Sequence, residues 1–286
     1  MRRWAVGALC FLVLGVLALG GCGERSGGLD GDLTDDWRPM AAATPFRPQA
    51  GVCHADLVPS VTVDGYAPVP CAESHLAETV AVATVSRQSA AQAFATCSAA
   101  ASAFLGGDWR TGWVVLQPVS PSKAAWAGGA RWVRCDVAET SPVDGALVHR
   151  TGSLKGSVRA GGRLRMGCAN PTVRGDTVTQ MHPVACPSGH TAEFAGLFTT
   201  TRARSDDLSS AEVAKGCDRA IARFAGIADD ASLPSRVGWL GFPPDDAAWQ
   251  MGDRSIRCFL WLNGEKMTGS YRGAGPGKLK IHYVSG

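Results

Sequence analysis

The chain has 286 residues, with 28 lysines and arginines against 25 aspartates and glutamates and a formal net charge of +3. No lysine- or arginine-rich stretch stands out, so the composition argues against a nucleic-acid partner. The length is generous for one domain and suits two small ones.

The N-terminus predicts export and a lipid anchor. Arg2 and Arg3 precede an uncharged apolar run over residues 4–19, and two glycines then lead to Cys22. A secretory signal has this layout, whereas the run is marginal as a membrane span, which needs about 20 apolar residues. Leu-Gly-Gly-Cys (19–22) resembles the lipobox of bacterial lipoproteins; an uncleaved anchor with an incidental cysteine is the alternative. We expect a signal peptide over 1–21, lipid on Cys22, and a protein held at the extracytoplasmic face of the cell membrane.

Residues 22–50 predict a flexible tether between that lipid and the rest of the chain. The segment contains glycine, proline, aspartate and alanine and shows no apolar periodicity. Such a composition does not bury enough apolar surface to fold.

The remainder is a tandem repeat. "PVPCAESHLAE" (68–78) corresponds to "PVACPSGHTAE" (183–193), "PSKAAW" (121–126) to "PPDDAAW" (243–249), and "TGSLKG" (151–156) to "TGSYRG" (268–273). The period of about 115 residues exceeds that of solenoids and matches a whole small domain. We predict one repeat over 51–160 and a second over 164–286, joined by a short glycine-rich segment.

Each repeat predicts a strand, a helix and a second strand. "TVAVATV" (79–85) and the weaker "EFAGLF" (193–198) suit strands. Ser89 with Gln92, and Ser209 with Glu212, are capping-box patterns that begin a helix. "VRCDV" and "IRCFL" alternate as strands do, so their cysteines point inward. The fold class is α+β: two tandem, disulfide-stapled domains, each a small β-sheet with one main α-helix.

Eight cysteines remain after Cys10 and Cys22, an even number that predicts a disulfide framework in an exported chain. They are Cys53, Cys71, Cys97, Cys135, Cys168, Cys186, Cys217 and Cys258. Each helix cysteine, Cys97 or Cys217, faces the core, as does the cysteine of the last strand. Pairing helix with strand leaves Cys53–Cys71 and Cys168–Cys186. Four cysteines allow three connectivities per repeat, and the sequence leaves the others open.

These residues resemble the septum formation domain family of actinobacterial envelope lipoproteins and membrane proteins. The resemblance rests on "GVC" (51–53), "VPCAESHLAE", Cys97, Trp126 and Cys135 in the first repeat. It rests on "VACPSGHTAE", Cys217, Trp249 and Cys258 in the second. It implies an envelope location and a link to septum formation, and it supplies no catalytic residues.

The repeated Cys-x3-His-x2-Glu motif is the main candidate site, with His75 and Glu78 in one copy and His190 and Glu193 in the other. A zinc site usually needs four ligands, and the motif offers three, one of them a cysteine expected in a disulfide. The same disulfide argues against a cysteine nucleophile. A general base and a ligand-recognition site are alternatives. We expect a structural corner, with no metal or cofactor.

Several tryptophans and histidines lie outside this motif. Trp126 and Trp249 suit core positions better than binding platforms. Trp109 and Trp113 suggest an exposed recognition patch, and His54, His149, His182 and His282 suggest surface positions.

The leading hypothesis is a non-catalytic envelope module that binds a protein or a cell-wall component. The alternatives are an envelope hydrolase and a small-molecule- or metal-binding lipoprotein.

Overall fold

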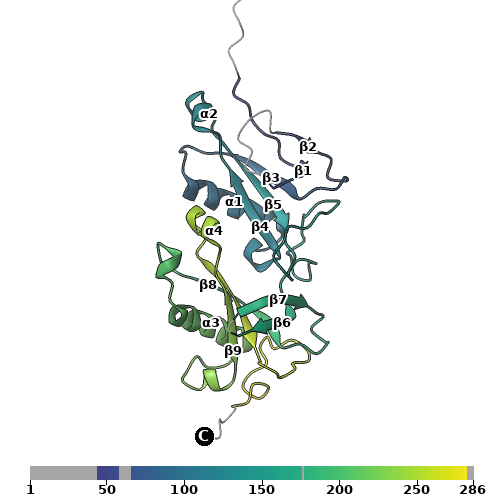
Figure 1. Ribbon diagram of the computed structural model, residues 1–286, viewed down its shortest axis with the longest axis vertical. Helices are drawn as coiled ribbons and strands as arrows, with labels where there is room; N and C mark the ends of the chain where they lie inside the picture. Colours follow the sequence, from purple (N-terminus) through teal and green to yellow (C-terminus); the bar gives the residue numbers. More distant parts are fainter. Residues whose placement is uncertain (1–43, 58–65, 176, 282–286) are drawn as a thin grey trace, which may run out of the picture. The chain divides into compact units, whose positions relative to one another are not determined.

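Two antiparallel sheets of five strands form the core of the protein (Figure 1), which is described here by a computed structural model. The structure describes residues 44–57, 66–175 and 177–281. Both sheets lie in a unit that runs from Pro45 to Gly286, separate from Met1–Thr44. The predicted signal peptide and Cys22 lie outside the described residues. Within the described ranges, no helix has the length and apolar character that a membrane span requires.

The first sheet has the strand order β2-β1-β3-β5-β4. Helix α1 (Ala90–Leu105) packs on β3, β4 and β5, while the short helix α2 (Lys123–Ala127) and the 3₁₀ helix η1 (Trp109–Thr111) lie in loops. The strands are β1 (Cys53–His54), β2 (Pro68–Val69), β3 (Ala77–Thr84), β4 (Val114–Val119) and β5 (Trp132–Glu139).

The second sheet repeats this order as β7-β6-β8-β10-β9. Its main helix, α3 (Ser210–Ala225), packs on β8, β9 and β10. Shorter elements are α4 (Asp246–Met251), η2 (Ser205–Asp207) and η3 (Leu233–Ser235). The strands are β6 (Cys168–Arg174), β7 (Thr177–Pro183), β8 (Ala192–Thr199), β9 (Gly238–Phe242) and β10 (Ser255–Trp261). The predicted α+β class is confirmed.

Both main helices begin where the capping-box patterns predict. The Ser89 hydroxyl accepts a hydrogen bond from the Gln92 amide, and Ser209 does the same for Glu212. Each helix ends at a glycine in the left-handed region, Gly106 (φ 79°) or Gly226 (φ 68°), where a Cβ would be strained. The helix faces that carry Cys97 and Cys217 are buried, as expected from the apolar spacing.

Four disulfides join the elements. Two link a main helix to the last strand of its sheet, and two link the first strand of a sheet to the turn that precedes its long strand. The pairs are Cys97–Cys135, Cys217–Cys258, Cys53–Cys71 and Cys168–Cys186, as predicted.

The last residues of the predicted tether pack on the first sheet. Trp132 donates from its indole nitrogen to the Phe46 carbonyl at 2.8 Å. Arg47 donates to the Val82 carbonyl at 3.1 Å. The chain is therefore attached to the sheet from Phe46 onward, several residues before the predicted boundary at residue 50.

The two repeats pack on each other within this unit. Helix α4 contacts α1, and Arg110 of η1 forms an ion pair with Asp253 at 3.1 Å. Arg257 donates to the Arg110 carbonyl at 2.9 Å. The ring of Trp113 lies 6.4 Å from that of Phe259. Trp109, expected in an exposed patch, is buried in the first core, where its indole nitrogen donates to the hydroxyl of Ser98 on α1. Trp113 is half-buried.

Candidate functional site

The Cys-x3-His-x2-Glu motif forms the same corner in both repeats. In the first, Cys71 lies in the turn after β2, His75 forms a bridge with Arg150, and Glu78 lies on β3. The second repeat arranges its own residues likewise, with Met267 as the bridge partner: Cys186, His190 and Glu193. The bridged segments follow the last strand of each sheet, and we call residues 150–156 and 267–273 the first and second arms.

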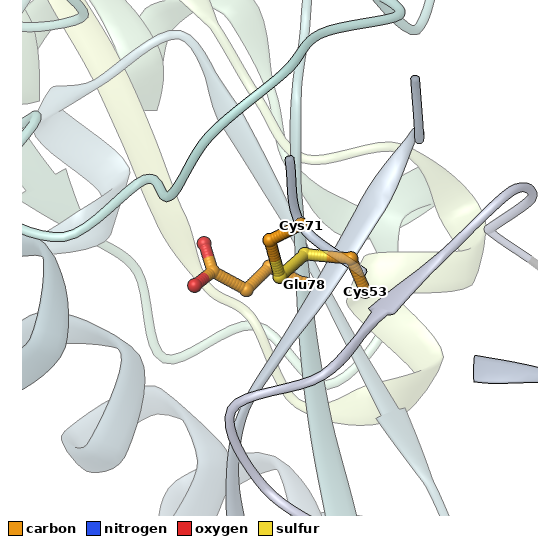
Figure 2. Close-up of side chains that lie close together, drawn as sticks. All are labelled: Cys53, Cys71 and Glu78. Atoms are coloured by element: carbon orange, nitrogen blue, oxygen red, sulfur yellow. A yellow bond between two sulfur atoms is a disulfide. The ribbon is translucent and has the colours of Figure 1, made fainter. Parts of the chain in front are cut away.

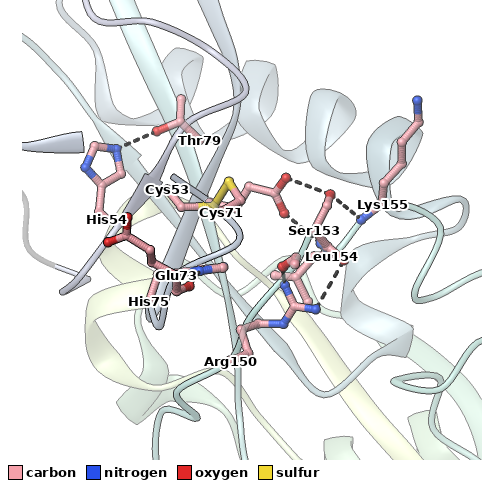
Figure 3. The surroundings of a disulfide bond; sticks show 12 residues. Cys53, His54, Cys71, Glu73, His75, Thr79, Arg150, Ser153, Leu154 and Lys155 are labelled. Atoms are coloured by element: carbon pink, nitrogen blue, oxygen red, sulfur yellow. Dashed lines mark hydrogen bonds between the residues drawn. A yellow bond between two sulfur atoms is a disulfide. The ribbon is translucent and has the colours of Figure 1, made fainter. Parts of the chain in front are cut away.

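Each motif glutamate fastens the arm of its own repeat. Glu78 is 3% exposed, and its carboxylate accepts hydrogen bonds from the Ser153 hydroxyl and the Leu154 amide, both at 2.7 Å. Figure 3 shows Ser153 and Leu154 close to the Cys53–Cys71 disulfide. Hydrogen bonds to an ionised group are stronger than neutral ones, so the carboxylate holds the arm against the sheet.

The second corner repeats this geometry. Glu193 is 4% exposed and accepts from the Ser270 hydroxyl at 2.6 Å and the Tyr271 amide at 2.7 Å. A backbone bond from Gly269 to the Cys186 carbonyl, at 2.8 Å, adds to the attachment. The echo between "TGSLKG" and "TGSYRG" in the sequence thus reflects two arms held by two equivalent carboxylates.

The motif histidines are packing groups that support the same attachment. His75 and His190 are both fully buried. Their Nδ1 atoms lie 2.8 Å from the carbonyls of Glu73 and Ser188, and because a carbonyl only accepts, Nδ1 is the donor in both. In both, Nε2 is buried and has no hydrogen-bond partner among the described residues. Neither ring reaches a surface where a substrate could meet it.

The corner does not offer a free set of metal ligands. Cys53, Cys71 and Glu78 lie close together (Figure 2). One ligand atom of each lies within 4.8 Å of the others, and the second corner has an equivalent group. Metal binding requires thiolates, but these sulfur atoms are joined in a disulfide. The carboxylate oxygens are already used by the arm. These donors therefore suit a structural corner better than a zinc site.

The two repeated tryptophans differ. Trp249 is 3% exposed and donates to the Ala203 carbonyl at 2.9 Å, so it is a core residue as expected. Trp126 is only half-buried, and the guanidinium of Arg131 lies 4.3 Å from its ring centre. The helix that carries Trp249, α4, also contacts α1 of the first repeat.

A buried polar network in the first repeat was not expected from the sequence. His54 is buried rather than exposed, and its Nε2 donates to the Thr79 hydroxyl at 2.9 Å. Thr79 donates to Asp136 at 2.7 Å, and Arg134 forms an ion pair with Asp136 at 2.7 Å. The pKa of His54 is lowered, and burial is the largest cause. The negative charge of Asp136 opposes this shift, and the positive charge of Arg134 adds to it.

The second repeat has an apolar cluster in place of this network. By strand register, His54, Thr79 and Asp136 correspond to Ala169, Phe194 and Phe259. The two phenylalanine rings pack 5.3 Å apart. A residue-by-residue comparison of the repeats, following the motif glutamate and the last cysteine, would have revealed the exchange. Alternation alone could not, because it places Asp136 and Phe259 on the face opposite the inward-facing cysteines, and it does not show that this second face is also buried.

A cavity of about 620 Å³ lies where the repeats meet. Aromatic and other apolar side chains form much of its lining, including Trp113, Phe242 and Phe259. Arg257 contributes a cationic group to the wall, and burial lowers its pKa. Cavities of this size and composition suit small-molecule ligands.

The equivalent sheets, the disulfide-linked helices and the duplicated corners define a disulfide-stapled α+β protein with an internal structural repeat. The chain belongs to the septum formation family, whose family model matches residues 50–258 in one span that covers both sheets. This membership, expected from the motif resemblance, associates the protein with the formation of the division septum. No curated protein and no solved structure matched the chain.

Proposed function

We propose that this protein is a non-catalytic, lipid-anchored protein of the cell envelope that acts in septum formation. Its two extracytoplasmic modules bind a protein or a cell-wall component, and Cys22 carries the lipid. The protein works without a cofactor and without nucleic acid.

One observation carries the non-catalytic part of the proposal. The only repeated acid–base candidates, His75 with Glu78 and His190 with Glu193, are committed to holding the arms. A general base must come within hydrogen-bond reach of its substrate, but both histidines are 0% exposed and the glutamates 3% and 4%. Both oxygens of each carboxylate already accept hydrogen bonds.

Two further observations support the location. Disulfides persist in oxidising compartments and are rare in the cytosol, and the described part of the chain contains four. The N-terminal sequence has the layout of an export signal that ends at Cys22.

The experiment replaces Glu193 with alanine in cells that depend on this protein for septation. We expect septation to fall in step with the amount of folded protein, because the carboxylate is structural. Glu73→Ala removes an exposed carboxylate near the first corner and should leave both unchanged. A Glu193 variant that accumulates fully folded and still fails to support septation would contradict the proposal and indicate catalysis or recognition at the corner.

The partner is sought by crosslinking in living cells. The full-length protein carries a photo-reactive residue, and Cys22→Ala serves as the control for anchoring. We expect a partner of envelope origin whose capture requires the anchor. Capture that is equally efficient without the anchor would contradict a role for the lipid in binding, and capture only of cytoplasmic proteins would contradict an extracytoplasmic function.

The cavity between the repeats favours a second candidate function, the binding of a small apolar molecule. Native mass spectrometry of the purified protein would show a bound mass that is lost on mild heating. Leu147→Trp places a bulky group at an exposed lining residue and should reduce occupancy. An unliganded mass for both proteins would argue against this candidate.

A further inference from the structure

One end of the first sheet carries four exposed cationic side chains. This end is where β3 and β4 finish and β5 begins, next to α2 (Figure 1). Three segments form it: residues 45–49, 84–92 and 119–132. The cations, all exposed, are Arg47, Arg87, Lys123 and Arg131. We call this end the basic end.

Contacts between the three segments show that they form one surface. Gln88 donates to the Pro121 carbonyl at 3.0 Å. The Val85 amide donates to the Arg131 carbonyl at 3.1 Å. Residues 45–49 join them through the bonds of Phe46 and Arg47 to the sheet. The four cations are therefore neighbours on the folded protein, although 84 positions separate the first from the last in the sequence.

The basic end has no acidic side chain to balance this charge. The three segments contain neither aspartate nor glutamate. None of the four cations forms an ion pair within the described part of the chain; the hydrogen bonds of Arg47 and Arg131 go to carbonyl and hydroxyl oxygens. The positive charge is thus directed to solvent or to an external partner.

The corresponding end of the second repeat has the opposite character. Residues 199–212 and 242–255 carry three arginines and six acidic residues: Asp206, Asp207, Glu212, Asp245, Asp246 and Asp253. This end also meets the first repeat, since α4 contacts α1 and Met251 packs against the first core. Two copies of one fold therefore differ at this end: one is acidic and contacts the other repeat through α4, and the other is basic.

The chain enters the folded unit at the basic end. Pro45 lies beside Gly129, which follows α2. The residues before Pro45 include Cys22, the lipid site of the proposed function, on which the present inference rests. If residues 22–44 serve as the tether expected from their composition, a random-coil segment of that length spans roughly 25 Å on average, and a lipid on Cys22 would keep this end of the sheet near the membrane.

We propose that the basic end docks on the anionic phospholipid surface of the membrane to which the protein is tethered. Anionic headgroups attract nearby lysines and arginines, and each cation contributes a factor of about five to binding. Trp126, half-buried with Arg131 over its ring, suits the same surface, because tryptophan is enriched at the membrane–water interface. Docking sets the orientation of the two repeats, with the second repeat and the cavity directed into the envelope.

The test uses the full-length lipidated protein on vesicles of phosphatidylcholine alone or mixed with phosphatidylglycerol. Hydrogen exchange followed by mass spectrometry reports on residues 84–92 and 119–132. We expect slower exchange there on anionic vesicles only. High salt should remove this protection, because dissolved ions screen the attraction between the cations and the headgroups.

Charge reversal provides the matched comparison. Arg87→Glu with Lys123→Glu should abolish the protection, because two of the four attractive charges become repulsive. Lys215→Glu with Lys266→Glu reverses two exposed cations of the second repeat and should leave the protection intact. Equal exchange on neutral and anionic vesicles, or protection that survives reversal at the basic end, would overturn the inference. Sedimentation with neutral vesicles reports the lipid anchor separately, so its failure would count against the proposed function and not be confused with failure of the docking surface.

Discussion

The carboxylate of Glu193 accepts a hydrogen bond from the backbone amide of Tyr271, 78 residues further along the chain. Glu78 makes the same bond to Leu154 across 76 residues. A short motif near the start of each repeat therefore holds the segment at its end. The motif, a candidate for catalysis from its residue types, therefore stabilises the fold. This structural role can be tested directly.

Replacing Glu193 with alanine should lower the free energy of unfolding by about 1–3 kcal/mol, because the Ser270 hydroxyl and the Tyr271 amide lose the buried carboxylate that accepts their hydrogen bonds. Glu78→Ala should have a similar effect through the first arm. Chemical denaturation of the full chain would measure both, with Glu73→Ala as the control. Parental stability in both variants would refute the structural role of the carboxylates.

Replacing His190 with alanine should also destabilise the protein, because the ring fills a fully buried site and donates to the Ser188 carbonyl. The expected loss is about 1–3 kcal/mol for the hydrogen bond, with packing losses in addition. His75→Ala should behave alike. Thermal unfolding would show it, and His182→Ala, at an exposed position, serves as the control. Variants as stable as the parent would favour a recognition role for the corner.

Stability should fall as the pH drops from about 7 to 5, in part through His54. Burial lowers the pKa of His54 below its ordinary value of 6.5, so the unfolded chain takes up a proton more readily than the folded one. Stability therefore declines once the pH falls through the unfolded-state value. Denaturation at several pH values should show a shallower decline in His54→Gln than in the parent. His149→Gln, at an exposed position, should retain the parental slope, and an unchanged slope in His54→Gln would contradict the prediction.

Removing the Cys97–Cys135 disulfide should destabilise the first repeat strongly. The bond closes a separation of 38 residues, worth roughly 4 kcal/mol in the chain-entropy model. The double variant Cys97→Ala with Cys135→Ala tests this by denaturation.

Peptide mapping without reduction should recover all four disulfides within their own repeats, and a peptide that joins the two repeats would overturn the scheme.

Cys22→Ala should release the protein from membranes or leave an unprocessed precursor. The reason is that Cys22 alone follows both an apolar signal and two small residues. Fractionation and the mass of the mature N-terminus provide the measurement, with Cys10→Ala as the control. Unchanged processing and membrane association in Cys22→Ala would count against the lipid anchor.

The sequence by itself determined the duplication, the two sheet-and-helix units and the disulfide framework. These features depend on local spacing: Ser89 and Ser209 begin helices, alternating residues form strands, and the inward-facing Cys97 and Cys135 sit on neighbouring elements. Tertiary structure decided which partners those patterns meet. The attachment of Glu78 to Ser153, the burial of His54 and the covering of Trp249 but not Trp126 are long-range contacts. Periodicity shows which face of an element turns inward, but the residue that covers that face belongs to another part of the chain.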